Sequence, residues 1–316
     1  MPTLLVCLTE GQLRRLDRVR EIADGYRVVR APDGRHAALA DAEVVLGFLP
    51  PARLAEAPRL RWIQSWSAGL DWLVEHEAFD PAAAPGLVVT SASGVHAVPI
   101  GEHVFALLLA LSRRLPRALG DQRDRRWGAG DGVAEWFGKR LVVVGAGAIG
   151  ARVLHLAGAF GMSGVAVRAS GRATPGARRT VTPDRMAPEL AEADAVVAAL
   201  PLTDATYRML DAAAFAAMKP GAVFVNVGRG ETVDQYDLVA ALESGHLGGA
   251  GLDVFEDEPL PASSPLWAMD RVIVTPHLAG DSPRYAERAL ALFADNLARW
   301  RDGRELRNRV DLRAGY

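Results

Sequence analysis

Cysteine is almost absent from this sequence of 316 residues. Cys7 is the only one, so the chain can form neither an internal disulfide nor a cluster of thiolate metal ligands. It lies in the apolar run TLLVCL, a predicted first strand, and a free cysteine there is typical of a buried core position. Nothing in the sequence indicates a metal site, and we expect none.

Long apolar runs and an excess charge of one sign are also lacking. The longest apolar candidate, 104–111, has eight residues, well short of the ~18 that a membrane span needs. The start, MPTLLVCLTE, shows neither the basic region nor the cleavage site of a signal peptide. The 36 Lys and Arg against 38 Asp and Glu give a net charge of −2, which argues against nucleic acid or a membrane surface as partner. We therefore expect a globular, cytoplasmic protein.

What is present is an alternation of short apolar runs with Ala-, Leu- and Arg-rich helical stretches, which predicts an α/β protein. The length suggests two domains, at roughly 100–200 residues each. The later runs are almost continuous in Val, Ala and Leu, as expected for parallel strands covered on both faces. The predicted strands are 3–8, 26–30, 43–47, 61–65, 87–90, 141–145, 164–168, 195–199, 222–227, 249–253 and 272–275.

Two long helices with one apolar face are predicted. The segment 97–115, AVPIGEHVFALLLALSRRL, repeats its apolar residues at three- and four-residue steps, and we interpret it as the crossing between the domains. Near the end of the chain, Leu290, Phe293, Leu297 and Trp300 fall on one helical face with charges opposite. A face of this kind needs a surface to pack on, and the first domain is the expected one.

A glycine-rich turn follows the predicted strand 141–144 directly and opens a helix. Its glycines are Gly145, Gly147 and Gly150, which suit a tight turn, a close approach of backbone to a pyrophosphate, and helix-to-strand packing. The helix N-terminus would offer free N–H groups and positive potential to the phosphates. In this strand–turn–helix context the motif predicts a dinucleotide site.

The second strand of this unit lacks the carboxylate that usually ends it. Arg168 stands 18 residues after Gly150, and no acid follows before Asp184. A carboxylate there accepts hydrogen bonds from the ribose 2′-hydroxyl of NAD, whereas an arginine presents donors to a 2′-phosphate. Ser170 and Arg172 can add a hydroxyl and a second cation. We predict NADP(H) as the preferred cofactor with NAD(H) as the alternative, the competing interpretation being a solvated basic turn.

Later strands end in a set of polar side chains that would meet at one edge of a parallel sheet. Ligands of such sheets bind outside the carboxyl ends of the strands. An arginine can hold a carboxylate, a histidine can protonate a developing alkoxide, and an acid can orient the imidazole. This set suits hydride transfer to a carbonyl beside a carboxylate. The strand-end residues are Leu200, Pro201, Arg229, Asp253, Glu258 and His277, and among the other histidines only His96 is kept as a second candidate.

These residues resemble the D-2-hydroxyacid dehydrogenase family over essentially the whole chain. The resemblance rests on SAGLDWL, SGVHAVPIGEHVFALLLAL, VVGAGAIGARV, NVGRGETVDQYDLVAALESGHLGGAGLDVFEDEPLPASSPLW and VIVTPHLAG. It implies Arg229 as the ligand of the substrate carboxylate, Glu258 as the partner of the histidine and His277 as the acid/base. It also implies substrate binding by backbone amides around Ser67, Ala68 and Gly69.

The resemblance further implies the fold, the assembly and the cofactor contacts. We expect two Rossmann-like, doubly wound parallel-sheet domains with a cleft between them, and a homodimer built around the coenzyme domain. Residues 1–96 plus 285–316 would form a flavodoxin-like substrate domain, and 97–284 the NADP-binding domain. The expected cofactor contacts are Gly145, Gly147, Ala148, Ile149, Gly150, Arg168, Ser170, Arg172, Leu200, Pro201, Thr206, Val227, Gly228, Arg229, Asp253, His277 and Gly280.

Within the family the chain is most similar to bacterial glyoxylate/hydroxypyruvate reductases of the A type, including the ending VDLRAGY. Glu258 argues against the formate dehydrogenases, which carry Gln there. The expected reaction is NADPH-dependent reduction of a small 2-keto acid to the D-2-hydroxy acid, with Phe48, Leu49 and Trp66 as candidates for substrate selectivity. Two alternatives stay open. One is an NAD-preferring dehydrogenase of longer-chain substrates, and the other is a non-catalytic, dinucleotide-sensing corepressor-like protein.

Overall fold

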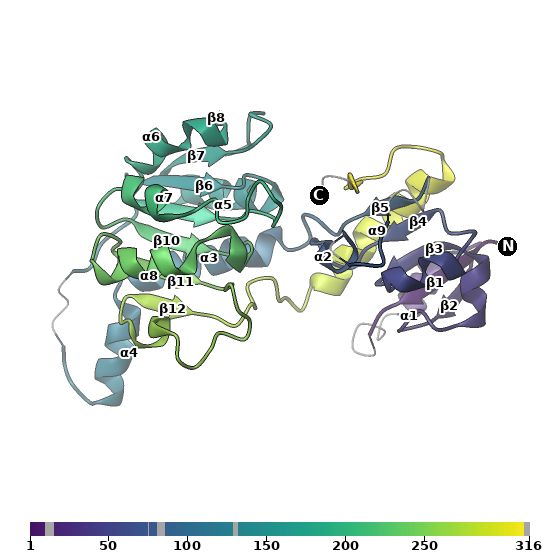
Figure 1. The fold of residues 1–316 in the computed structure, drawn as a ribbon, viewed down its shortest axis with the longest axis horizontal. Coiled ribbons are helices and arrows are strands. Elements are labelled where there is room, and N and C mark those ends of the chain that lie inside the picture. The colour runs from purple at the N-terminus through teal and green to yellow at the C-terminus, as the bar shows by residue number, and fades with distance from the viewer. Residues whose placement is uncertain (10–15, 75, 81–85, 129–131, 313–316) are drawn as a thin grey trace. The chain divides into compact units, whose positions relative to one another are not determined.

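The computed structural model describes residues 1–9, 16–74, 76–80, 86–128 and 132–312. These residues form two compact units, 1–95 with 282–316 and 96–281 (Figure 1). The last residues of the VDLRAGY ending, 313–316, lie outside the described residues. None of the helices described is long and apolar enough to cross a membrane.

The first unit is a five-stranded parallel sheet in the order β2-β1-β3-β4-β5, the flavodoxin-like 2-1-3-4-5 arrangement. Its strands and helices are β1 (Thr3–Cys7), α1 (Leu16–Ile22), β2 (Arg27–Arg30), β3 (Ala42–Gly47), β4 (Trp62–Gln64), α2 (Asp71–Val74), β5 (Val88–Thr90) and α9 (Tyr285–Arg301). Alternate residues of the strands point into two separate apolar layers, one of which holds α1 and α9.

The apolar face of α9 packs on this sheet. Leu290, Phe293 and Leu297 are buried in the same cluster as Trp62 of β4, and the rings of Phe293 and Trp62 stack with centroids 5.8 Å apart. The segment after residue 282 therefore completes the core of the first unit, although nearly two hundred residues separate it from β5.

The second unit is a seven-stranded parallel sheet in the order β12-β11-β10-β9-β6-β7-β8. The order reverses between β6 and β9, which is the switch point of a doubly wound sheet. Its elements are α3 (Ala97–Ser112), α4 (Leu115–Arg123), β6 (Arg140–Val144), α5 (Ala148–Ala159), β7 (Ser163–Val167), β8 (Arg179–Val181), α6 (Met186–Leu190), β9 (Ala195–Ala198), α7 (Ala212–Ala217), β10 (Val223–Asn226), α8 (Gln235–Glu243), β11 (Gly249–Leu252) and β12 (Val272–Val274). The predicted fold class, two parallel-sheet α/β units, is confirmed.

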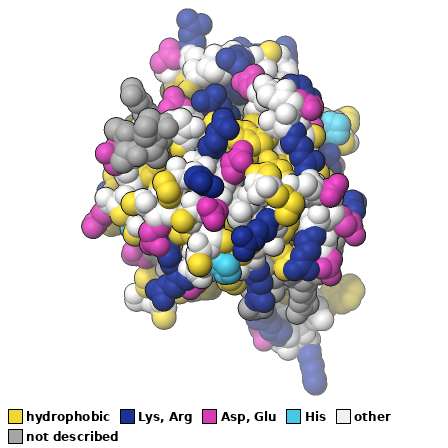
Figure 2. Space-filling model, turned by 90° about the vertical axis from the view of Figure 1, so that its right-hand side faces the viewer, with side chains coloured by type: hydrophobic (Ala, Val, Ile, Leu, Met, Phe, Trp, Pro, Cys, Tyr) yellow, Lys and Arg dark blue, Asp and Glu magenta, His cyan; other side chains and the backbone are white. Residues whose placement is uncertain are grey.

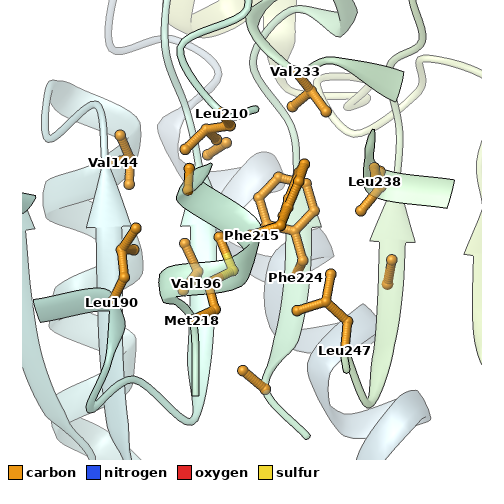
Figure 3. Close-up of a cluster of buried hydrophobic side chains, with 14 of the residues drawn as sticks. Val144, Leu190, Val196, Leu210, Phe215, Met218, Phe224, Val233, Leu238 and Leu247 are labelled. Atoms are coloured by element: carbon orange, nitrogen blue, oxygen red, sulfur yellow. The ribbon is translucent and has the colours of Figure 1, made fainter. Parts of the chain in front are cut away.

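Helices cover both faces of the larger sheet. Side chains of α6, α7 and α8 pack with one set of alternating strand residues, and those of α3 and α5 pack with the other set. Figure 3 shows the first layer, in which Phe215 of α7 lies edge-on to Phe224 of β10 with centroids 5.4 Å apart. Coverage on both faces explains why these strands read as continuous apolar runs.

The predicted helix 97–115 is shorter in the structure. It ends at Ser112, and α4 begins at Leu115. Arg114 between them has φ 57, a left-handed conformation that stops a helix, and Pro116 lacks the N–H that continuation would need.

On the face shown in Figure 2, cationic and anionic side chains are interspersed with apolar ones. Charges of both signs neighbour one another there, in keeping with the small net charge of the whole chain.

Candidate active site

The glycine turn after β6 leaves no room for side chains at two of its three glycines. Gly145 has φ +95, and a β-carbon there would lie 2.5 Å from the carbonyl oxygen of Ala199. A β-carbon on Gly150 would lie 2.8 Å from the carbonyl oxygen of Gly145, so β6 and α5 could not approach as closely. A β-carbon on Gly147, in contrast, would meet nothing within 4 Å. The turn is thus closed toward the protein and open on its outer side, as a pyrophosphate cradle requires.

The N-terminus of α5 faces this turn without a side-chain cap. The amides of Ala148, Ile149 and Gly150 belong to the first helical turn, whose N–H groups have no carbonyl partner within the helix. Such a helix start stabilises a bound anion through its free donors and positive potential. The predicted glycine loop therefore fits the phosphates of a dinucleotide.

Arg168 directly follows β7, at the end of the second strand of the nucleotide unit. It is half-buried, whereas Ser170 and Arg172 are exposed. Within the described part of the chain, no carboxylate lies within ion-pair distance of the Arg168 or Arg172 guanidinium. Arg179, by contrast, bonds at 2.5 Å to Glu189, whose side chain is buried. The segment 168–179 therefore holds three arginines with no anionic partner among the described residues, Arg168, Arg172 and Arg178, and a fourth, Arg179, that is paired with Glu189.

The ends of β9 and β10 lie side by side, on the other side of β6 from β7. Leu200 and Val227 are buried, and Pro201 is exposed. A β-carbon on Gly228 would lie 2.6 Å from the Leu200 carbonyl oxygen, so the two strand ends touch through backbone. The hydroxyl of Thr206 donates to the Pro201 carbonyl at 2.7 Å and holds the loop after β9 closed.

His277 and Glu258 form a pair at the carboxyl ends of β11 and β12. The distance from His277 Nδ1 to Glu258 Oε2 is 2.7 Å, and Glu258 Oε1 accepts the backbone N–H of Phe255 at 3.0 Å. The side chain of His277 is 51% exposed, so its other ring nitrogen is accessible to a ligand. A carboxylate on Nδ1 fixes the ring orientation and stabilises the imidazolium.

Asp253 is buried, with 2% of its surface exposed, and its carboxylate is already engaged by the protein. Oδ1 accepts the hydroxyl of Thr275 at 2.6 Å and the backbone N–H of Leu278 at 3.0 Å, while Oδ2 accepts that of Ala279 at 2.9 Å. Asp253 was predicted to contact the cofactor. The hydrogen bonds of its carboxylate go to Thr275, Leu278 and Ala279, in the segment that carries His277.

Arg229 follows β10, and its guanidinium donates to the Gly228 carbonyl at 3.0 Å. It lies within electrostatic range of His96, whose Nδ1 is 3.2 Å from the Gly280 carbonyl oxygen. Burial lowers the pKa of His96 below its ordinary value, and the positive charge of Arg229 acts in the same direction. Gly280 fits closely, because a β-carbon there would lie 2.8 Å from His96 Nδ1. Arg229, His96 and Gly280 thus form one local group in the second unit.

In the first unit, the loop after β4 carries half-buried backbone donors. The hydroxyl of Ser67 donates to the Gly69 carbonyl at 2.6 Å, while the amides of Ala68 and Gly69 have no acceptor among the described residues. Such amides can bind a carboxylate. The loop is anchored by Tyr285 of α9, whose hydroxyl donates to the Trp66 carbonyl oxygen.

The sequence matches the model of the D-isomer specific 2-hydroxyacid dehydrogenase, NAD binding domain, over residues 105–279. The chain belongs to the D-isomer specific 2-hydroxyacid dehydrogenase family. It is therefore an oxidoreductase with a nucleotide-binding domain of this family.

Relatives of the dehydrogenase carry several names. It is 33% identical over 317 residues to glyoxylate/hydroxypyruvate reductase B of Citrobacter koseri, covering 93% of this chain and 94% of that one. It is 37% identical to D-3-phosphoglycerate dehydrogenase of Mycobacterium bovis over 81% of this chain, but spans only 46% of that longer protein. Its structure is similar, with a TM-score of 0.85 and 26% identity over the full length of both chains, to the NADPH-dependent glyoxylate/hydroxypyruvate reductase (SmGhrA) of Sinorhizobium meliloti in complex with NADP and sulfate.

One selectivity candidate of the dehydrogenase is wrong. Leu49 is 0% exposed and packs in the core of the first unit, so its side chain cannot face a substrate. Trp66 is also buried, edge-on to Tyr285. Phe48 is half-buried and contacts Trp72 edge-on, with centroids 5.4 Å apart. The apolar sequence GFLPP could not reveal which of its side chains points inward.

Sequence reasoning also missed two polar groups that support the dehydrogenase site. One is a buried network in the first unit, where Gln64 Oε1 accepts the Thr90 hydroxyl and the Asn296 amide, each at 2.9 Å, directly before the loop at Ser67. The other is His103 on α3, which contacts Thr275 beneath the His277 loop. His103 lies seven residues after His96, a spacing that places two side chains on one face of a helix. This spacing is the signal by which the sequence could have indicated His103.

Proposed function

We propose that the protein reduces a small 2-keto acid of the glyoxylate or hydroxypyruvate type to the D-2-hydroxy acid with NADPH. In this proposal His277 is the proton donor, Glu258 its partner and Arg229 the ligand of the substrate carboxylate. The unit of residues 96–281 binds the cofactor, and the other unit supplies further substrate contacts.

The observation that carries the proposal is the contact of 2.7 Å between His277 Nδ1 and Glu258 Oε2 at the carboxyl edge of the larger sheet. Because the carboxylate accepts the proton of Nδ1, the imidazolium keeps a second proton on Nε2. Bound NADPH supplies the hydride for the carbonyl carbon. The Nε2 proton of His277 passes to the carbonyl oxygen as its bond order falls, and the neutral ring remains bonded to Glu258.

The substrate carboxylate needs a cation and fixed donors. Arg229 at the end of β10 can bind it through two parallel N–H bonds, which orients the neighbouring carbonyl. The amides of Ala68 and Gly69, without acceptors among the described residues, are likewise suited to bind a carboxylate. Orientation of this kind lowers the barrier because the reacting groups are held before the reaction begins.

The choice of NADPH over NADH rests on the turn after β7. Arg168 and Arg172 have no carboxylate partner among the described residues, and no acid occupies the place of the ribose-binding carboxylate. A 2′-phosphate would find donors there and no repulsion. The Sinorhizobium relative, which binds NADP, supports the same choice.

The decisive experiment is a matrix of kcat/KM values for NADPH and NADH against glyoxylate, hydroxypyruvate, pyruvate and bulkier 2-keto acids. We expect the highest values for NADPH with glyoxylate and hydroxypyruvate. A clear preference for NADH with bulky acids would favour the longer-chain dehydrogenase. Absence of NADPH oxidation with every acid would contradict the proposal and favour a dinucleotide-sensing protein.

We also propose that the protein forms a homodimer through the second unit. Large apolar side chains there are exposed on and after α4, namely Leu115, Leu119, Trp127 and Phe137. Contiguous exposed apolar surface marks protein–protein interaction sites, and we propose that these four side chains contribute to one. Sedimentation equilibrium would show a dimer, and a monomer at micromolar concentration would contradict this proposal.

A further inference from the structure

A buried hydrogen-bonded chain runs from α3 to the loop that carries His277. Its members are His103 on α3, Thr275 at the end of β12 and Asp253 at the end of β11. His103 Nε2 lies 3.1 Å from Thr275 Oγ1, and that hydroxyl lies 2.6 Å from Asp253 Oδ1. The side chain of His103 is 15% exposed and that of Asp253 is 2% exposed.

The direction of these hydrogen bonds follows from the number of protons that each group can donate. A threonine hydroxyl carries one proton, and the short contact with the Asp253 carboxylate uses it. Thr275 Oγ1 can therefore only accept from His103, so the neutral imidazole carries its proton on Nε2. Burial lowers the pKa of His103, although the negative charge of Asp253 opposes this effect, and the neutral form is the one that fits.

Asp253 links this hydrogen-bonded chain to the His277 loop and fixes the conformation of the loop. Its carboxylate accepts the N–H groups of Leu278 and Ala279, and its backbone oxygen accepts that of His277 at 2.9 Å. Three consecutive amides are thus bound to one residue. His277 itself has φ 51, a left-handed conformation that is unfavourable for a residue with a β-carbon. The surrounding hydrogen bonds must hold it there.

We propose that His103 and Thr275 are positioning residues for the active site, which act on His277 through Asp253. Without the Thr275 hydroxyl, Asp253 Oδ1 loses its shortest donor and the N–H of His103 loses its acceptor. The carboxylate can then rotate away from the amides of Leu278 and Ala279, and the contact between His277 and Glu258 loosens. The catalytic consequence rests on the proposed function, whereas the effect on the loop does not.

Two matched pairs of variants test this role. Thr275→Val keeps the shape of the side chain and removes the hydroxyl, while Thr275→Ser keeps the hydroxyl. His103→Leu removes the donor on α3, while His103→Gln retains an N–H donor. With NADPH and glyoxylate we expect Thr275→Val to lower kcat roughly 10- to 100-fold with the KM for NADPH unchanged, and Thr275→Ser to restore most of the loss. We expect His103→Leu to lower kcat more than His103→Gln does, and both losses to be smaller than the loss in Thr275→Val.

Hydrogen exchange of the backbone amides reports on the loop without turnover. The amides of Leu278 and Ala279 should exchange faster in Thr275→Val than in wild type and in Thr275→Ser. An unchanged kcat in folded Thr275→Val, or equal losses in the Val and Ser variants, would overturn the positioning role. If Thr275→Val does not fold, the His103 pair decides by the same measurements.

The two proposals can fail separately. If the wild type oxidises NADPH with none of the 2-keto acids, the proposed function fails, and exchange at Leu278 and Ala279 still decides the positioning role. Equal protection of these amides in all variants would overturn the positioning role whatever the activity.

Discussion

His277 combines exposure to a ligand with a fixed orientation. Its backbone is held by Asp253, and its Nδ1 contacts Glu258 at 2.7 Å, so the free ring nitrogen is directed by contacts on two sides. Replacing it with alanine removes the side chain that the proposed function assigns as the proton donor. We expect His277→Ala to lower kcat by about 10²- to 10⁴-fold, the range of general acid catalysis.

Steady-state kinetics of NADPH oxidation measure this loss. The matched control is His155→Ala, which removes an exposed imidazole from α5. Turnover of His277→Ala equal to that of the control would remove the acid/base assignment.

Arg229 has a different expected signature, because in the proposed function it binds the substrate carboxylate, which does not change during the reaction. Loss of charge-assisted hydrogen bonds to a carboxylate costs about 1.5–3 kcal/mol. We expect Arg229→Ala to raise the KM for the 2-keto acid roughly 10- to 100-fold with a smaller fall in kcat. A fall in kcat alone, with KM unchanged, would show that Arg229 acts on the transition state only.

In the proposed function, Arg168 favours NADPH over NADH as the hydride donor. Arg168→Asp places a carboxylate at the end of β7, where it would repel a 2′-phosphate and accept a ribose hydroxyl. We expect kcat/KM for NADPH to fall about 100-fold while the value for NADH does not fall. Arg185→Asp, a charge change at an exposed arginine in the same unit, is the control. Equal loss with both nucleotides would mean that Arg168 contributes to the fold and not to the choice of cofactor.

At the scale of elements, most strands could be predicted from the sequence because burial on both faces makes them continuous apolar runs. Predicted strands such as 141–145 and 195–199 agree with β6 and β9 within one residue at each end. The exception is β8, Arg179–Val181, which the sequence did not predict. It is a three-residue edge strand with one apolar residue, so it carries none of the apolar pattern on which strand prediction depends.

The amphipathic pattern of α9 makes a quantitative prediction about stability. Phe293 is fully buried and stacks on Trp62. Truncating such a phenylalanine leaves a cavity that the neighbours fill only in part, and we expect Phe293→Ala to lower the free energy of unfolding by about 3–5 kcal/mol. Denaturant unfolding measures it, with Ala291→Ser on the exposed face of α9 as a control expected within about 0.5 kcal/mol of wild type.

At the scale of the whole molecule, the sequence was most informative where chemistry lies at strand ends. The ends of parallel strands share one edge of a sheet, so the neighbourhood of Glu258 and His277 could be predicted from β11 and β12 alone. The contact between His103 and Thr275 could not be predicted. It depends on how α3 packs against the sheet, which brings the two residues together across 172 positions of sequence. The burial of Leu49 was missed for a similar reason, since only tertiary packing decides which side chain of a loop turns inward.

Two half-buried histidines, His96 at the N-cap of α3 and His103 within α3, predict how the stability of the molecule depends on pH. Burial lowers the pKa of both His96 and His103 below the ordinary value of about 6.5 that they regain on unfolding. As the pH falls, the unfolded chain therefore takes up these protons before the folded one. The free energy of unfolding rises with pH wherever the unfolded state binds more protons. The stabilisation that depends on the neutral rings is thus complete above about pH 7 and is lost as the pH falls through 6.5 toward the folded-state values.

Urea unfolding at pH 7.5, 6.5 and 5.5 tests this dependence, because most carboxylates titrate below this range. Each histidine can add a slope of at most about 1.4 kcal/mol per pH unit. We expect the decline toward pH 5.5 to be shallower in His103→Gln and in His96→Gln than in wild type, and shallowest in the double variant. His155→Gln removes an exposed imidazole and should keep the wild-type slope. Equal slopes in the wild type and the double variant would show that neither buried ring is held neutral by the fold.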